Sequence, residues 1–268
     1  FYTALLKDKP ADAKRELDWA KGRAGEYRFI STQSRALQEQ GKLKNSLDVS
    51  RHAMELAENQ KFPEVAQAEL GWQAMVHADF GVCGTAREEA SAVAAKPSRF
   101  GMVFAGFAFA TCGDSQKTDA LAAELGKKYP LETFAQKIDI PSIRARQELQ
   151  RGNGAKAVEA LKPAERYEFG FSSLGIPAYL RGLAYLQMKQ GAQAVAEFQK
   201  ILDHREAIGP SPHIALAHLG LARAHAMAGD ASKSRIAYQD FFTLWKDADP
   251  DLPVLQQAKA EFAKLAAQ

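Results

Sequence analysis

The chain has 268 residues, of which 46% are hydrophobic and 25% are charged, the composition of an ordinary folded protein. Lys and Arg total 35 against 32 for Asp and Glu, and both signs are spread along the chain. A general nucleic-acid binder would concentrate its basic residues on one face, and a membrane-surface helix would be basic along its polar side, so neither class is expected. The most apolar run, residues 100–112, is too short to span a bilayer and predicts a buried helix.

Apolar residues at helical spacing, separated by Gly, Asp and Pro, predict helices throughout and no strands. A partial helix at 1–7 leads into a helix at 11–21. The expected pairs that follow are 26–40 with 43–59, 63–80 with 85–95, 98–111 with 115–128, 131–151 with 154–166, 175–190 with 192–204, and 212–228 with 230–246. Pro141 should break or kink the 131–151 helix, because proline has no N–H to donate within a helix.

A final helix at 251–266 carries an apolar stripe of Leu255, Ala258, Phe262 and Leu265. Such a helix is expected to cover the last open apolar edge of a stack of helix pairs. At the other end, the apolar residues from Phe1 to Leu6 look like half of a pair. We therefore expect the chain to be part of a longer protein.

Small residues recur where neighbouring helices must approach each other. In first helices, Gly106 and Gly182 each stand three residues before an aromatic ring, which fills the space beside them. In second helices, a small residue recurs at intervals of 32 to 40 residues. Its positions are Ala13, Ser46, Ala86, Thr118, Ala157, Ala194 and Ser234. Glycines follow most first helices, at Gly41, Gly81, Gly113, Gly152 and Gly229, where they can end a helix in the left-handed conformation.

This pattern resembles the tetratricopeptide repeat, whose period is about 34 residues. The clearest matches are Gly182, Tyr185, Ala194, Phe198 and Ile201 in one repeat, and Leu221, Ala222, Gly229, Asp230, Ser234 and Tyr238 in the next. In the first of these repeats, Gly191 comes two residues later than the family places its turn glycine. The resemblance implies an all-α, right-handed α–α superhelix of about seven helix pairs plus a C-terminal covering helix. Residues 1–268 would then form a single solenoid domain.

The last hundred residues resemble a narrower group of proteins. They resemble the C-terminal repeat region of bacterial multi-domain serine/threonine protein kinases or winged-helix regulators. The resemblance implies a sensor or docking module, with any kinase activity in sequence outside this chain, because no kinase motif occurs within it. The compartment stays open. It would be the extracytoplasmic side of the bacterial inner membrane for a membrane-anchored kinase and the cytoplasm otherwise.

Stacked first helices line a concave groove in such a fold. The helical register places these residues on it: Arg28, Ser31, Arg35, Met75, Phe100, Val103, Phe107, Arg146, Tyr179, Leu183 and Arg223. Aromatic and arginine side chains are typical binding anchors, so the groove should accept a peptide with apolar and acidic side chains. A slip of one residue would instead bury Phe100 and Phe107 between helices.

The sequence offers little evidence for a metal site or for a disulfide bond. The six histidines lack an HExxH motif or accompanying carboxylates, and we expect no metal or cofactor and no direct membrane insertion. Cys83 and Cys112 lie at turns of adjacent repeats. Because neighbouring helices pack about 8–10 Å apart, a disulfide would need a favourable local twist, and two unpaired thiols are the simpler expectation.

The leading interpretation is a non-catalytic protein- or peptide-binding scaffold. The alternative is a helical-toroid enzyme that acts on a small molecule or glycan, which would need paired carboxylates at a cavity. Acidic residues such as Glu148, Glu159 and Asp203 are instead scattered over predicted polar faces. A helical-repeat RNA reader is disfavoured by the near-zero net charge.

Overall fold

The computed structural model describes residues 1–7, 9–170 and 173–266, which form α-helices without strands. The helices of the first half are α1 (Tyr2–Leu6), α2 (Pro10–Ala20), α3 (Glu26–Glu39), α4 (Leu43–Asn59), α5 (Pro63–Asp79), α6 (Cys83–Ala95), α7 (Arg99–Thr111) and α8 (Ser115–Lys128). Those of the second half are α9 (Ile140–Gln150), α10 (Gly154–Leu161), α11 (Ile176–Gln187), α12 (Gly191–Asp203), α13 (Arg205–Ile208), α14 (Pro212–Met227), α15 (Ala231–Leu244) and α16 (Pro253–Ala266). The all-helical prediction is confirmed.

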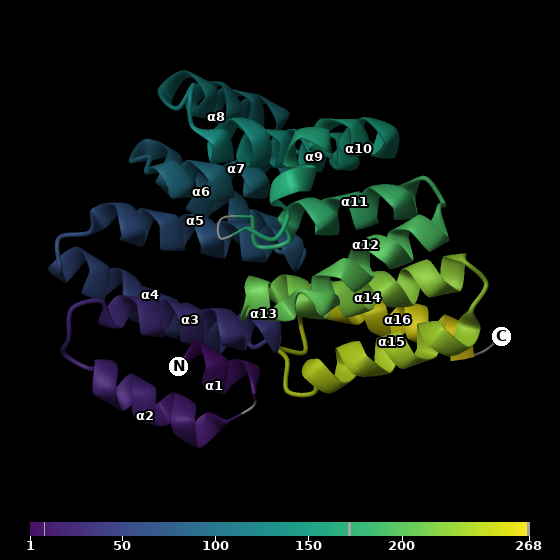
Figure 1. Cartoon of the computed structure of the whole chain (residues 1–268), viewed down its shortest axis with the longest axis horizontal. Coiled ribbons are helices and arrows are strands. Elements are labelled where there is room, and N and C mark those ends of the chain that lie inside the picture. The colour runs from purple at the N-terminus through teal and green to yellow at the C-terminus, as the bar shows by residue number, and fades with distance from the viewer. Residues whose placement is uncertain (8, 171–172, 267–268) are drawn as a thin grey trace.

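The helices pack as consecutive pairs, from α1 with α2 to α14 with α15, and neighbouring pairs stack on each other (Figure 1). The first helices α5, α7, α9 and α11 contact one another in that order. Buried residues from Leu43 to Ala258 form one continuous hydrophobic core. Within the described residues, no helix has the length and apolar character required to cross a bilayer.

Small residues bring the helices together as the sequence predicts. The fully buried ring of Phe198 lies against two glycines on neighbouring helices, Gly182 of α11 and Gly220 of α14. A Cβ atom added to either glycine would stand 2.7 or 2.6 Å from this ring. Gly106 likewise faces Ile143, the residue on which α9 packs against α7.

The turn after most first helices is made by a glycine with positive φ, as predicted for Gly41, Gly81, Gly113, Gly152 and Gly229. The turn between α11 and α12 differs, because Lys189 takes the left-handed position with φ 57°. Gly191 instead begins α12, where an added Cβ would meet backbone atoms of α14 at 2.9 Å. The displaced glycine noted in the sequence therefore serves close packing.

The segment predicted as one helix at 131–151 is helical over residues 133–150, close to the predicted bounds. Pro141 does not break this helix. A π-helical stretch, η1 (Ala135–Asp139), comes just before this proline, and α9 continues from η1, so the irregularity expected at Pro141 takes the form of a widened turn. The helix predicted at 154–166 also changes character, from α10 to a 3-10 turn, η2 (Lys162–Tyr167).

The two ends of the array meet, a feature the sequence did not predict. Trp245 Nε1 donates to the carbonyl oxygen of Glu39 (3.0 Å), and the Asp249 amide donates to the carbonyl oxygen of Gly41 (3.0 Å). The buried Glu39 carboxylate accepts from Arg205 and from the amide of Ser211. Helices α3 and α14 therefore lie against each other, and the chain curls back on itself (Figure 1).

The C-terminal helix covers an apolar edge, as expected. Leu255 and Ala258 are buried, and the Phe262 ring packs against Tyr238 and Phe242 of α15. The amide of Val254 also donates to the carbonyl oxygen of Phe80, so α16 bridges α15 and the end of α5.

Candidate functional site

An aromatic row runs along α7 and continues onto α5. Phe100, Phe104 and Phe107 are spaced four and three residues apart, which places them on one face of α7. Phe104 contacts the other two rings at 6.5 and 6.4 Å between centroids, and it meets Trp72 of α5 edge-on at 5.2 Å. Trp72 is anchored by a hydrogen bond from its Nε1 to Gln38 (2.7 Å).

Three arginines from different elements each cover one of these rings. Their guanidinium carbons lie 4.5 to 4.9 Å from the ring centroids, a favourable cation–π geometry. The pairs are Arg35 over Trp72, Arg99 over Phe100, and Arg146 over Phe107. We call these six residues together with Phe104 the aromatic–arginine ladder.

The ladder is accessible at one end and closed at the other. Phe100 is 42% exposed, Arg35 is partly exposed, and Arg28 lies exposed two turns before Arg35 on the same helix. At the closed end, Phe107 and Arg146 are each 3% exposed. Phe100 therefore lies at the surface, whereas Phe107 is buried between helices.

Arg146 enters a buried charge cluster that joins three helices. It donates to both carboxylate oxygens of Asp79 at the end of α5, and to the Thr111 hydroxyl at the end of α7 (2.8 Å). His213, in the first turn of α14, lies 3.1 Å from the same carboxylate. Burial alone would raise the pKa of Asp79, but the charge of Arg146 and the hydrogen bond from His213 outweigh it and lower the pKa to about 2.

A cavity of about 190 Å³ lies beside this cluster, between α5, α11, α14 and α16. Three of the predicted groove residues, Tyr179, Leu183 and Arg223, line it together with Asp79. Burial and the nearby charge of Asp79 raise the pKa of Tyr179 well above its usual range, so its hydroxyl stays neutral. Arg223 is held by Glu261 of α16 (2.8 Å).

The eleven predicted groove residues therefore separate into groups. Arg28, Ser31, Arg35 and Phe100 lie on the accessible part of the first helices, and Tyr179, Leu183 and Arg223 line the cavity. Phe107 and Arg146 form the buried link between them. The remaining two, Met75 and Val103, belong to the hydrophobic core.

The sequence reasoning missed Trp72, Asp79 and His213. Trp72 and Asp79 lie on α5, a helix whose residues from Gly71 to Ala78 are all buried, so no polar face marked them out. Asp79 and His213 are 134 residues apart, and their partnership depends on the curling of the chain.

The acidic residues considered for a toroid enzyme do not converge. Glu148 binds Arg151 and Asn153 next to it in sequence, Glu159 pairs with Lys162, and Asp203 accepts from Gln199. Of the described residues that line the cavity, Asp79 alone is a carboxylate, and it is already engaged.

Four of the six histidines pair with a single carboxylate or stack on a ring, namely His77, His204, His213 and His218. His77 lies 2.7 Å from Glu89, and the ring of His204 stacks on Phe169 at 3.9 Å. Across residues 1–7, 9–170 and 173–266, no three His, Cys, Asp or Glu side chains are grouped as metal ligands would be.

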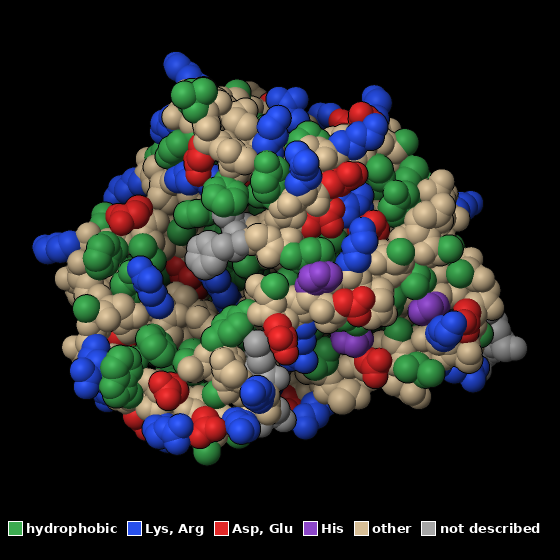
Figure 2. Space-filling view, in the orientation of Figure 1, with side chains coloured by type: hydrophobic (Ala, Val, Ile, Leu, Met, Phe, Trp, Pro, Cys, Tyr) green, Lys and Arg blue, Asp and Glu red, His purple; other side chains and the backbone are tan. Residues whose placement is uncertain are grey.

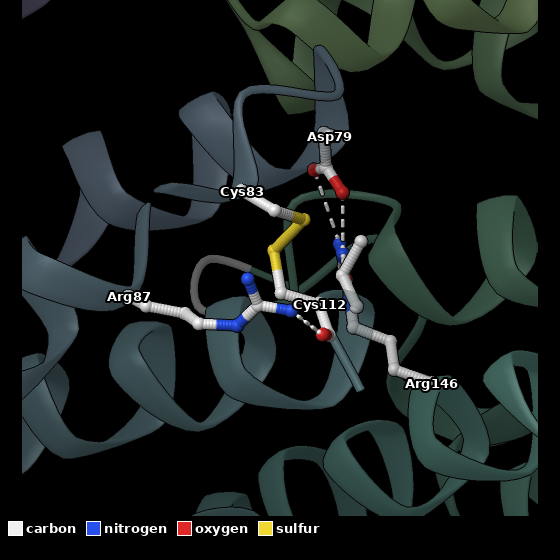
Figure 3. The surroundings of a disulfide bond; sticks show 6 residues. Asp79, Cys83, Arg87, Cys112 and Arg146 are labelled. Carbon is white, nitrogen blue, oxygen red and sulfur yellow. Dashed lines mark hydrogen bonds and ion pairs between the residues drawn. A yellow bond between two sulfur atoms is a disulfide. The ribbon is translucent and has the colours of Figure 1, made fainter. Parts of the chain in front are cut away.

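Cys83 and Cys112 form a disulfide, so the expectation of two unpaired thiols is wrong. Cys83 opens α6 and Cys112 follows the last residue of α7, and these ends meet with a Cα–Cα distance of 5.5 Å. The expectation assumed facing helix axes, but the bond joins a helix start to a helix end. Figure 3 shows the disulfide close to the Asp79–Arg146 pair, with Arg87 donating to the carbonyl oxygen of Cys112.

Comparisons with known proteins give no matching family model, no similar curated protein and no similar solved structure. The geometry of the ladder and of the cavity is therefore the basis for a functional proposal.

Proposed function

We propose that this chain is a binding module that captures an extended peptide with an acidic side chain close to an aromatic or aliphatic one. The observation that supports this proposal most directly is the accessible end of the aromatic–arginine ladder. Arg35 stacks on Trp72 there, it is partly exposed, and it has no carboxylate within 4.0 Å among the described residues. A guanidinium held flat against a ring can bind an incoming carboxylate in bidentate fashion.

The surroundings of Arg35 fit the rest of such a peptide. Phe100 offers an exposed ring, linked to Arg35 through the contacts of Phe104 with Trp72. Arg28 adds a second positive charge on the same face of α3.

The closed end of the ladder supports this surface without contacting the peptide. Because Arg146 neutralises Asp79 inside the protein, its removal would leave a buried carboxylate uncompensated and would disturb the fold. Variants that test binding must therefore fall at Arg35 and Phe100.

The test is selection of peptides from a random phage-displayed library, followed by titration of enriched peptides by calorimetry. We expect enriched peptides to combine Asp or Glu with a nearby aromatic or leucine residue. Arg35→Gln and Phe100→Ala should each weaken binding about tenfold or more, as removal of an anchor does. Arg144→Gln, at an exposed arginine of α9, is the matched control and should bind like the unmodified protein. Lack of enrichment, or equal binding by all variants, would refute the proposal.

As the sequence resemblance implies, we further propose that the module serves as a docking or sensor region in a larger bacterial signalling protein. A search for fragments or small glycans that raise the melting temperature tests the toroid alternative. That alternative is favoured by the curling of the chain around a cavity. A hit lost on Tyr179→Phe would support a small-molecule site there.

A further inference from the structure

The loops that join one helix pair to the next share a composition. Four consecutive ones, at 21–25, 60–62, 96–98 and 129–132, combine exposed apolar side chains with exposed lysine or arginine, in the loop or in the adjoining helical turn. We call this set the basic–aromatic edge. Its apolar members are Trp19, Phe62, Phe100, Leu131 and Phe134, and its basic members are Lys21, Arg23, Lys61, Lys96, Lys127, Lys128 and Lys137.

The concentration of apolar side chains is high for a surface. Eight large hydrophobic side chains are exposed in the described residues, and five of them belong to this edge. Leu131 is 95% exposed and Trp19 is 57% exposed. The turns within pairs at 40–42, 80–82, 112–114 and 151–153 expose none. The two ends of the helix pairs in the first half of the chain thus differ in chemistry.

The four loops lie along one edge because each one leads into the first helix of a pair, and neighbouring first helices pack side by side. Phe62 contacts Tyr27 near the start of α3 at 5.8 Å, and Arg99 at the start of α7 binds Glu132 beside η1 (2.9 Å). Gly101 of α7 lies against Gly71 of α5. In Figure 1 these loops follow the left and upper left of the molecule, and Figure 2 shows basic side chains projecting along the same border.

The edge carries a surplus of positive charge. Lys128 pairs with Glu124, but Lys21, Lys61, Lys96, Lys127 and Lys137 have no carboxylate within 4.0 Å in the described structure. Glu58 and Glu64 are the exposed acidic residues that flank the 60–62 loop. The lysines therefore outnumber the free carboxylates there.

We infer that the basic–aromatic edge adsorbs to the surface of an anionic lipid bilayer. Aromatic side chains favour the boundary between lipid headgroups and acyl chains, and each lysine near an anionic surface strengthens binding about fivefold. The apolar groups stand on separate loop tips, which can enter a soft interface individually. The prolines of these loops, Pro63, Pro97 and Pro130, hold the tips in place.

A lipid bilayer accounts for the exposed apolar side chains at the loop tips better than a nucleic-acid partner does. Stacking on single-stranded RNA uses ring faces along a basic groove. Leu131, the most exposed member, has no ring. This adsorption requires no spanning helix. The edge shares Phe100 with the peptide surface proposed above, and its other members lie outside that surface.

The experiment is co-sedimentation of the protein with vesicles of phosphatidylcholine alone or mixed with phosphatidylserine. We expect binding that needs phosphatidylserine and weakens with salt. Leu131→Ala with Phe134→Ala should lower the partition coefficient about tenfold. Lys61→Gln with Lys96→Gln should lower it more than tenfold, at about fivefold per lysine.

The matched control is Met227→Ala with Ile236→Ala, which removes exposed apolar side chains elsewhere and should leave binding unchanged. None of these variants touches Arg35 or Phe100, so peptide binding can be scored separately. The inference is overturned if vesicles of both compositions fail to bind, or if the control variant loses as much binding. It is also overturned if polyuridylate or polyglutamate binds through the same residues while vesicles do not.

Discussion

Removal of the Cys83–Cys112 disulfide should lower the free energy of unfolding substantially. The bond closes a loop with a sequence separation of 29 residues. The chain-entropy relation for a loop of this length gives a loss of about 3.5 kcal/mol at 25 °C. Urea unfolding followed by far-ultraviolet circular dichroism would compare the oxidised protein with the Cys83→Ser, Cys112→Ser double variant. The reduced, unmodified protein serves as the control and should match the double variant.

The disulfide should also influence the buried charge cluster. Asp79 lies four residues before Cys83, and Thr111 immediately precedes Cys112, so the bond positions two partners of Arg146 (Figure 3). Thr111→Val removes one hydrogen bond, worth about 1 kcal/mol. We expect this cost to shrink by at least about 0.5 kcal/mol when the disulfide is absent, since coupled residues are not additive. A loss below about 1 kcal/mol from the cysteine variant, compared with the 2–4 typical of disulfides, would refute the reasoning. So would full additivity.

Five further substitutions test the helix packing, the turns and the buried carboxylates. Gly220→Ala should destabilise by about 1–3 kcal/mol, because its Cβ would stand 2.6 Å from a buried ring. Gly84→Ala, with nothing within 4 Å, should instead stabilise by about 0.5 kcal/mol. Lys189→Gly should raise the urea midpoint slightly, because relief of the left-handed backbone outweighs the added freedom of the unfolded chain. The pKa of Asp79 is about 2, below its ordinary 3.8, so about 2 kcal/mol of stability present above pH 4 should be lost as the pH falls through 2. Burial raises the pKa of Asp139 to about 6, against the opposing charge of Arg99, so its contribution is full below pH 4 and is lost as the pH rises through 6. Unfolding measured from pH 2 to 7 should show each dependence disappear on Asp→Asn substitution at that site. Equal effects of the two glycine variants, a lower midpoint for the lysine variant, or unchanged pH profiles would contradict these expectations.

The helices could be predicted to within a few residues because each one carries local signals at its ends. Asp114 and Asp230 accept hydrogen bonds from the amides of Lys117 and Lys233, as helix-capping residues do. The helix predicted at 131–151 runs from 133 to 150, and the break or kink expected at Pro141 is a π-helical stretch just before it. Local chemistry therefore accounts for most of the helix map.

The functional surface was less predictable because contacts between distant helices decide it. Phe100 and Phe107 are seven residues apart and share a face of α7, yet Phe100 is 42% exposed and Phe107 is 3% exposed. Phe107 is covered by Arg146 of α9, a helix that packs against α7, whereas the arginine over Phe100 is Arg99 of its own helix. The period of a helix identifies a face but not the helix that packs against it.

The hydrogen bonds that join Glu39 and Gly41 to Trp245 and Asp249 have a consequence for folding. In an open repeat array, terminal pairs fray independently and contacts are local, which favours fast folding. Here the α3–α4 and α14–α15 pairs protect each other, so amide protons in α3 and α15 should exchange with one shared opening free energy. Folding should end with a slow step, in which the chain closes a loop of about two hundred residues against its entropy.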